Sequence, residues 1–145
     1  MTSAKGFSKI LVAVDGSEVS LRAAERAAWI AKQDGAQLVA LTIVRVPMAD
    51  LPGGLAGYYE SARSEAKKWS NEVRAVAAQC GVGVKTEVVV GAYSVVDAIL
   101  GYAEASGVDL IVSGTRGMTP SRRMLVGSVA GGLVEYASCA VLVVR

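Results

Sequence analysis

The chain has 145 residues, with 15 Lys and Arg against 13 Asp and Glu and a formal net charge of +2. This length suits a single domain with a substantial core, and 52% hydrophobic against 19% charged residues excludes an intrinsically disordered chain. Nearly balanced charge gives no support for non-specific nucleic-acid binding, which needs a basic excess along the phosphates, so we expect no nucleic-acid partner.

Five short apolar runs predict the strands of a sheet, at residues 10–14, 38–44, 84–90, 110–112 and 140–144. Four of them are almost continuous in Val, Ile, Leu and Ala, which is typical of parallel strands buried on both faces. The third run alternates, with valines and Thr86 on one side and Lys85 and Glu87 on the other. This alternation predicts a strand near the edge of the sheet.

Four helical stretches lie between these runs. Ser17 is placed to cap a helix that runs to about residue 33, and three further helices are expected at about 57–80, 94–105 and 127–136. Apolar residues step by three and four along the 57–80 stretch, and we favour packing on the sheet over a surface for a partner helix. Gly35, Gly81 and Gly107 each follow a helix and supply the left-handed backbone that ends it.

Strands that alternate with helices through short returns predict a doubly wound α/β domain over residues 1–145, with a parallel sheet and helices on both faces. The irregular stretch is 46–55, where Pro47, Pro52, Gly53 and Gly54 forbid regular structure. A loop of this kind is either a lid over a site or a spacer, and the sequence leaves both open.

In sheets of this type, ligands bind beyond the carboxyl ends of the strands. After the first strand, Asp15-Gly16-Ser17 places a carboxylate at the strand tip and a turn into the first helix. Either polar side chain can cap that helix, but Ser17 is the better placed because Asp15 comes two residues too early. We therefore expect Asp15 to face a ligand.

The segment after the fourth strand, residues 113–128, is the most unusual in the chain. Gly114 and Gly117 let backbone amides approach an anion, and a helix that opens at Gly127 attracts phosphate to its N-terminus. Hydroxyl donors and positive charges lie in the same segment: Ser113, Ser128, Arg116, Arg122 and Arg123. An ordinary connection with solvated charges is the alternative, but a loop this long with glycines at both ends is uncommon as a mere connector.

Several classes of site are excluded. Histidine is absent, which removes His-based catalytic triads, the usual zinc sites and the commonest general base. No Gly-Lys-Ser/Thr ending is present, so there is no P-loop, and Gly81 and Gly83 precede a strand instead of a helix, so they form no dinucleotide fingerprint.

The sequence also indicates the compartment. Cys80 and Cys139 are expected to be buried thiols of a reducing compartment. The longest apolar run is 139–144, against the roughly 18 residues that a membrane span needs, and residues 1–8 show no signal segment. We therefore expect a cytoplasmic protein without a membrane partner.

The segment after the fourth strand also has the spacing Gly-x2-Gly-x9-Gly-Ser, filled by Gly114, Gly117, Gly127 and Ser128. This spacing resembles the ATP-binding signature of universal stress proteins. Residues 10–17, 41–44 and 141–145 agree with that family in order and position. The resemblance implies a five-stranded sheet in the order 3-2-1-4-5, a homodimer and, in the ATP-binding branch, bound ATP with or without Mg²⁺.

Carried over residue by residue, the resemblance implies contacts with each part of the nucleotide. Asp15 would bind the ribose or the adenine side. The base would be lined by Ala13, Val14 and Ile43, and the phosphates would be surrounded by Gly114, Gly117, Gly127, Ser128 and Val129.

The chain departs from the family's pattern at three positions. Members often have His at Thr42, Ser or Thr at Ala130, and Pro at Ala140. The hydroxyl missing at Ala130 removes one hydrogen bond, about 0.5–1.5 kcal/mol, which weakens a phosphate contact without abolishing the site.

The expected function is a nucleotide-dependent sensor or regulator in the stress response, whose nucleotide state changes its affinity for regulatory protein partners. A slow ATP hydrolase or phosphotransferase is the alternative, although Asp15 is the only well-placed carboxylate and we expect at most weak hydrolysis. A dimeric interaction module with a vestigial site is the third hypothesis. In the implied order the final strand lies at a sheet edge, which suits pairing with a second copy unless a helix or loop of the same chain covers it.

Overall fold

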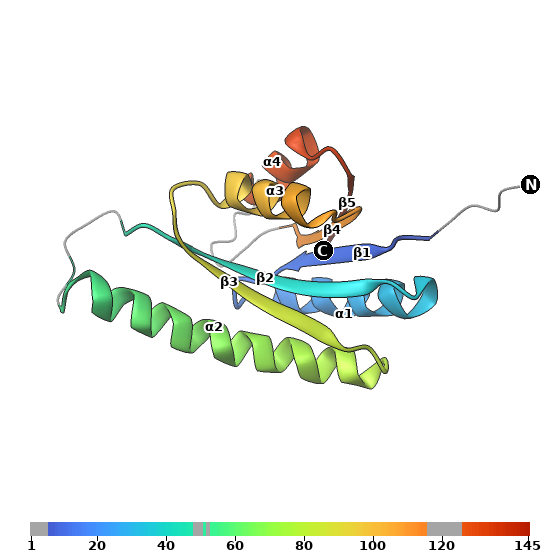
Figure 1. Cartoon of the computed structure of the whole chain (residues 1–145), viewed down its shortest axis with the longest axis horizontal. Coiled ribbons are helices and arrows are strands. Elements are labelled where there is room, and N and C mark those ends of the chain that lie inside the picture. Colours follow the sequence, from blue (N-terminus) through green and yellow to red (C-terminus); the bar gives the residue numbers. More distant parts are fainter. Residues whose placement is uncertain (1–5, 48–50, 52, 116–125) are drawn as a thin grey trace, which may run out of the picture.

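The computed structural model describes residues 6–47, 51, 53–115 and 126–145. In chain order the elements are β1 (Lys9–Ala13), α1 (Glu18–Asp34), β2 (Gln37–Arg45), α2 (Gly54–Gln79), β3 (Val84–Ala92), α3 (Val95–Ser106), β4 (Leu110–Gly114), α4 (Ser128–Tyr136) and β5 (Ala140–Val144). The five strands are parallel and lie in the order β3-β2-β1-β4-β5, which confirms the predicted fold (Figure 1).

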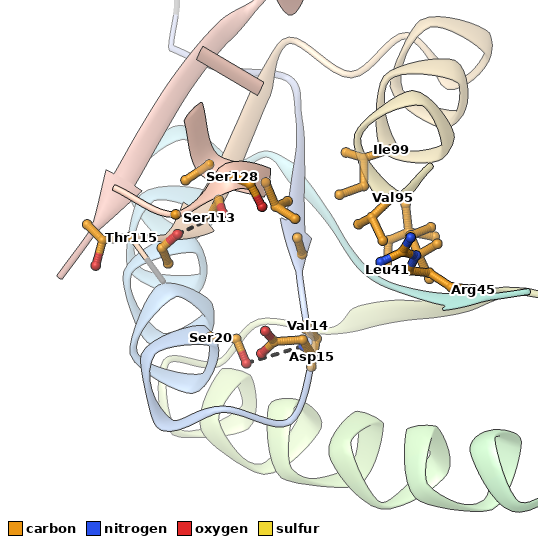
Figure 2. A pocket seen from close by; sticks show the side chains of 16 residues that line it. Val14, Asp15, Ser20, Leu41, Arg45, Val95, Ile99, Ser113, Thr115 and Ser128 are labelled. Atoms are coloured by element: carbon orange, nitrogen blue, oxygen red, sulfur yellow. Dashed lines mark hydrogen bonds between the residues drawn. The ribbon is translucent and has the colours of Figure 1, made fainter. Parts of the chain in front are cut away.

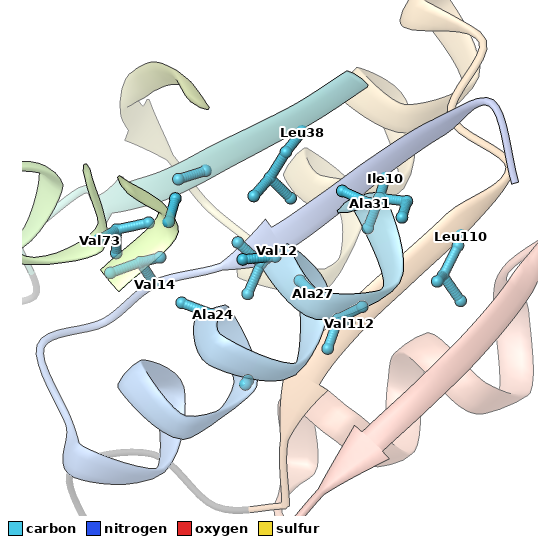
Figure 3. Packing of buried hydrophobic residues seen from close by; sticks show 14 residues of the cluster. Ile10, Val12, Val14, Ala24, Ala27, Ala31, Leu38, Val73, Leu110 and Val112 are labelled. Atoms are coloured by element: carbon cyan, nitrogen blue, oxygen red, sulfur yellow. The ribbon is translucent and has the colours of Figure 1, made fainter. Parts of the chain in front are cut away.

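Helices cover both faces of the sheet. On one face, α1 and α2 pack against alternate side chains of the inner strands, among them Ile10, Val12 and Leu38 (Figure 3). On the other face, α3 and α4 pack against the side chains between these, such as Leu11 and Leu41. Since neighbouring residues of a strand point to opposite faces, the continuous apolar runs of the inner strands follow directly from burial on both sides.

The face of α1 that meets the sheet consists of small residues. Five alanines and one serine are buried there: Ser20, Ala23, Ala24, Ala27, Ala28 and Ala31. Alanine has no side-chain entropy to lose and favours the helix, and its small size lets the helix axis approach the strands closely. Figure 3 shows Val12 of β1 lying over Ala24 and Ala27 in this contact.

The predicted cap of α1 and the glycines predicted to end three helices are confirmed. The Ser17 side chain accepts a hydrogen bond from the Ser20 amide at 3.1 Å and so caps α1. Gly35 ends α1 and Gly107 ends α3, with φ angles of 65° and 72° that favour glycine. Gly81, with φ 74°, follows α2 in the same way.

Two sequence predictions need correction. The stretch 46–55 is not irregular to its end, because α2 already begins at Gly54, after Gly53 adopts φ 86° as the residue before the helix. Residues 48–50 and 52, on which the lid-or-spacer question also depends, lie outside the described residues. Cys80 and Cys139 are free but only half-buried, because both lie at the ends of elements, where neighbouring chain covers them incompletely.

The third strand occupies the edge of the sheet that its alternation predicted. No residue of β3 is fully buried, and Lys85 and Glu87 form an ion pair of 3.3 Å on its exposed side. Within the described residues, none of the helices has the length and apolarity to span a bilayer.

Candidate functional site

A pocket of about 430 Å³ opens where β1, β2 and β4 end, next to the first turns of α3 and α4 (Figure 2). Its wall consists of Ala13, Val14, Asp15, Ser20, Leu41, Ile43, Arg45, Val95, Ile99, Ser113, Gly114, Thr115, Gly127, Ser128, Val129 and Ala130. β2 and β3 lie on one side of β1, and β4 and β5 lie on the other. The pocket therefore lies at the point where the strand order reverses. Ligands of open α/β sheets bind at such a point.

One wall of the pocket is apolar. Leu41 and Ile43 come from β2, and because they are two residues apart they point to the same face of the sheet. Val95 and Ile99 come from the first turns of α3, one turn apart, and Ala13 ends β1 between the two groups. A flat, weakly polar ring can bury its surface against this wall.

The opposite wall is polar and includes the N-terminus of α4. The residue before this helix is Gly127, which has no side chain to cap it, so the first amides of α4 keep their capacity to donate. Thr115 and Ser128 add hydroxyl groups on the same side of the pocket, whereas the Ser113 hydroxyl donates to the Gly114 carbonyl at 3.0 Å (Figure 2). Backbone amides, hydroxyls and a positive helix end suit an anion such as a phosphate.

The two described ends of the segment after β4 are tied together. The Gly127 amide donates to the Thr115 carbonyl at 2.5 Å, and the Thr115 amide donates to the Val144 carbonyl of β5 at 2.7 Å. These bonds position the start of α4 over the ends of β4 and β5. The polar wall is therefore tied to the sheet at both described ends of this segment, and residues 116–125 lie outside the described residues.

Asp15 lines the pocket and also braces the turn into α1. Its carboxylate accepts hydrogen bonds from the Ser17 amide at 3.0 Å and from the Ser17 hydroxyl at 2.5 Å. Ser17 in turn caps the helix, so the prediction that Ser17 and not Asp15 is the cap is confirmed. That Asp15 holds a ligand stays a prediction. The engagement of one carboxylate oxygen by Ser17 was not predicted from the sequence.

Gly114 has a packing role beside its place in the pocket. A Cβ at this position would lie 2.4 Å from Cγ1 of Val19 and 3.2 Å from the Val19 carbonyl carbon. The glycine thus lets the end of β4 approach the first turn of α1. The sequence alone predicts for Gly114 only that it lets backbone amides approach an anion.

Every predicted site residue except Gly117 lines this one pocket. Gly117, together with Arg116, Arg122 and Arg123, lies outside the described residues. Ala130, one of the departures from the family's pattern, is buried in the pocket wall, whereas Thr42 is buried on the opposite face of β2 and does not line it.

Several residues that line the pocket were not predicted from the sequence, among them Arg45, Val95 and Ile99 (Figure 2). A signal for two of them existed. Arg45 shares the face of Ile43 by strand alternation, and Ile99 follows Val95 by one turn and so lies on the same side of the expected helix.

Comparisons with known proteins show which family the chain resembles. The sequence model of the Universal stress protein family matches residues 6–145. Universal stress protein MJ0531 of Methanocaldococcus jannaschii is 38% identical over 142 residues, which cover 96% of this chain and 82% of that protein.

Solved structures show the same fold. Universal stress protein UspA from Lactobacillus plantarum superposes with a TM-score of 0.87 at 29% identity, covering 98% of this chain and 100% of that one. A universal stress protein crystallised in complex with cAMP superposes with a TM-score of 0.77 at 27% identity, covering 97% and 99%.

Proposed function

The chain belongs to the universal stress protein family, and from that premise we propose that it binds an adenine nucleotide, ATP, in the pocket at the ends of β1, β2 and β4. One observation carries the proposal: an apolar wall from β2 and α3 faces the uncapped N-terminus of α4 across one pocket. A purine needs the first wall and a phosphate needs the second. The cAMP bound by a structural neighbour supports the choice of an adenine nucleotide.

The proposed arrangement assigns a part of the ligand to each wall. The base packs on Leu41, Ile43 and Val95, and the phosphates meet the first amides of α4 and the Ser128 hydroxyl. Asp15 lies at the β1 end of the pocket, where its carboxylate accepts hydrogen bonds from ribose hydroxyls. A carboxylate is an acceptor only, so it suits a group that donates.

Mg²⁺ would accompany the phosphates without a dedicated protein site. Among the described residues, no three side chains of His, Cys, Asp or Glu gather in a way that could hold a metal ion. Mg²⁺ is commonly held by one or two carboxylates together with phosphates and water, so the nucleotide itself would supply most of its ligands.

We propose that the protein acts as a sensor or regulator in the cytoplasm, with nucleotide-bound and nucleotide-free states that differ in affinity for protein partners. The chain has no histidine, and Asp15 is the one carboxylate in the described pocket wall, already bonded to Ser17. A general base beside the terminal phosphate is therefore not evident. Slow ATP hydrolysis or phosphotransfer is the second candidate, and a dimeric module with a vestigial site is the third.

The test begins with the protein as purified. Denatured protein is analysed by ion-exchange chromatography for released nucleotide, and the protein freed of nucleotide is titrated with ATP by calorimetry, with and without Mg²⁺. Stoichiometric binding with hydrolysis well below the 1–10³ s⁻¹ of ordinary enzymes supports the regulator. Turnover of about 1 s⁻¹ or faster that is lost in a pocket variant makes the protein an enzyme, and absence of binding supports the vestigial site.

A further inference from the structure

Arg45 is a charged side chain at the apolar end of the pocket. Figure 2 shows it on the side of Val95 and Ile99, across the cavity from Ser113 and Ser128. Among the described residues that line the pocket, it carries the one positive charge, and Asp15 carries the one negative charge. Because the groups that suit a phosphate lie on the other side of the pocket, phosphate binding does not account for the position of this positive charge.

The backbone around Arg45 is held in place from two sides. The pairing of β2 with β3 shifts register here, since Val44 lies opposite Val90 but Arg45 lies opposite Ala92. The extra residue of β3 is Gly91, whose φ of 85° favours glycine, and the Val46 amide donates to the Ala92 carbonyl at 2.8 Å. A bulge of this kind bends the strand and re-aims side chains beside a site.

The second support comes from α2. The Tyr58 hydroxyl donates a hydrogen bond to the Arg45 carbonyl at 3.0 Å. Since side chains two apart in a strand share a face, Arg45 continues the row of Leu41 and Ile43 that lines the pocket. The bulge and the tyrosine thus fix the direction in which an otherwise exposed side chain leaves the strand.

We propose that the guanidinium of Arg45 covers the base of the bound nucleotide and contributes affinity through the base, independently of the phosphates. The proposal rests on the proposed function and deepens it. Guanidinium groups are planar and lie flat against aromatic rings, which favours a ring that rests on the apolar wall beneath. In the proposed arrangement the phosphates bind at the N-terminus of α4, on the far side of the pocket. The part of the nucleotide nearest to Arg45 is then the base.

The test compares ligands with and without phosphate. Arg45→Ala, Arg45→Lys and a control, Arg26→Ala, at an exposed arginine of α1 outside the pocket, are titrated with adenosine and with ATP by calorimetry. Arg45→Ala is expected to weaken both ligands by the same factor, about two- to fivefold. Arg45→Lys recovers part of the loss because it restores charge without the planar group, and Arg26→Ala matches the wild type.

Two results overturn the proposal. If Arg45→Ala lowers the affinity for ATP but not for adenosine, the arginine contacts the phosphates. If the affinity for neither ligand changes, the arginine does not contact the nucleotide. Both differ from failure of the proposed function, in which the wild-type protein itself binds neither ligand. Urea unfolding of each variant, expected to match the wild type because Arg45 is exposed, separates a binding effect from a folding defect.

Discussion

Gly16 lies directly against the indole of Trp69. A Cβ on Gly16 would lie 2.4 Å from Cε2 and 2.7 Å from Nε1 of that ring, closer than real Cβ atoms approach. The glycine also has φ 85°, a conformation that favours glycine. Trp69 belongs to α2 and packs on the core cluster under α1, so the long helix supports the turn that positions Asp15.

This contact predicts that Gly16→Ala destabilises the protein strongly. The added methyl group would overlap the Trp69 ring, which packs against the core, and overpacking of this kind costs about 1–3 kcal/mol. The left-handed backbone adds a further cost of roughly 1 kcal/mol for a residue other than glycine. Gly35→Ala is the matched control, because Gly35 has φ 65° but nothing within 4 Å of an added Cβ. Urea unfolding should give a loss of about 2–4 kcal/mol for Gly16→Ala and about 1 kcal/mol for Gly35→Ala.

Trp69→Ala identifies the cause. In that background the three atoms nearest to the added methyl are gone, so Gly16→Ala should cost about as much as Gly35→Ala, and the double-mutant cycle should show coupling of about 1 kcal/mol or more. Equal costs for Gly16→Ala with and without Trp69 would show that backbone strain alone explains the glycine.

Asp15→Asn separates the two roles of this carboxylate. An asparagine oxygen still accepts from the Ser17 amide and hydroxyl, so the turn is expected to persist and the unfolding free energy to change little. The free carboxylate oxygen is replaced by an amide NH2, which donates and cannot accept from a ribose hydroxyl. The charge-assisted bond to ribose is therefore lost, a cost of about 1.5 kcal/mol or more, or roughly tenfold in ATP affinity by calorimetry.

Deoxynucleotides check this reading. The wild-type protein should prefer ATP over one of its 2′- or 3′-deoxy analogues, and Asp15→Ala should remove that preference. If Asp15→Ala lowers ATP and both analogues equally, the carboxylate acts only by bracing Ser17.

How far the sequence predicts this site differs from residue to residue. The inner strands were recognisable because Ile10, Leu11 and Val12 are buried on both faces and leave no polar position. Their spatial order is not local information, and it came from the family resemblance. The start of α2 was predicted too late because glycine has a low helix propensity and two glycines, Gly53 and Gly54, stand there. In the structure Gly53 has a positive φ, which lets the chain change direction just before the helix begins.

Arg45 and Gly114 show a second limit. Strand alternation puts Arg45 on the face of Ile43, but the bulge at Gly91 beside it belongs to a strand that is distant in the chain and does not follow from the local pattern. Gly114 carries the family's spacing, yet its contact with Val19 is a packing constraint that no spacing reveals.

Gly117→Val tests the phosphate end of the site. Gly117 lies outside the described residues, so this prediction rests on its spacing from Gly114 and Gly127 alone. A valine is expected to block the approach of backbone to the anion and to lower ATP affinity tenfold or more, about 1.4 kcal/mol. Adenosine, which has no phosphate, is the internal control and should bind as tightly as to the wild type. Unchanged ATP binding would remove this glycine from the site.

Cys139 is expected to react slowly with alkylating agents. Burial raises the pKa of its thiol above the usual value, and the Asp109 carboxylate adds to the rise. Because the thiolate is the nucleophile, a raised pKa leaves less of it at pH 8, and the rate should climb only as pH passes the usual thiol range. Iodoacetamide labelling of the Cys80→Ser variant, followed by mass spectrometry, measures this thiol alone. Labelling at pH 8 as fast as glutathione's would contradict the prediction.

The outer edge of β5 is the feature on which a homodimer would depend. Among the described residues, β5 pairs with β4 on one side and with no strand on the other. Leu142 and Val144 pack toward the α1 side of the core and Val141 toward the α3–α4 side, whereas Val143 belongs to neither cluster and is only half-buried. An apolar edge strand without Lys or Pro invites pairing with another chain.

We therefore expect a twofold homodimer in which the β5 strands of two copies run antiparallel, since one symmetric contact closes both edges. Val143→Lys is the sharpest variant, because among residues 141–144 this side chain is the one that packs against neither core cluster. It should convert dimer to monomer or aggregate in sedimentation at micromolar concentration. Ala105→Lys, at an exposed position of α3, should stay dimeric. A wild-type protein that remains monomeric at that concentration would contradict the predicted dimer.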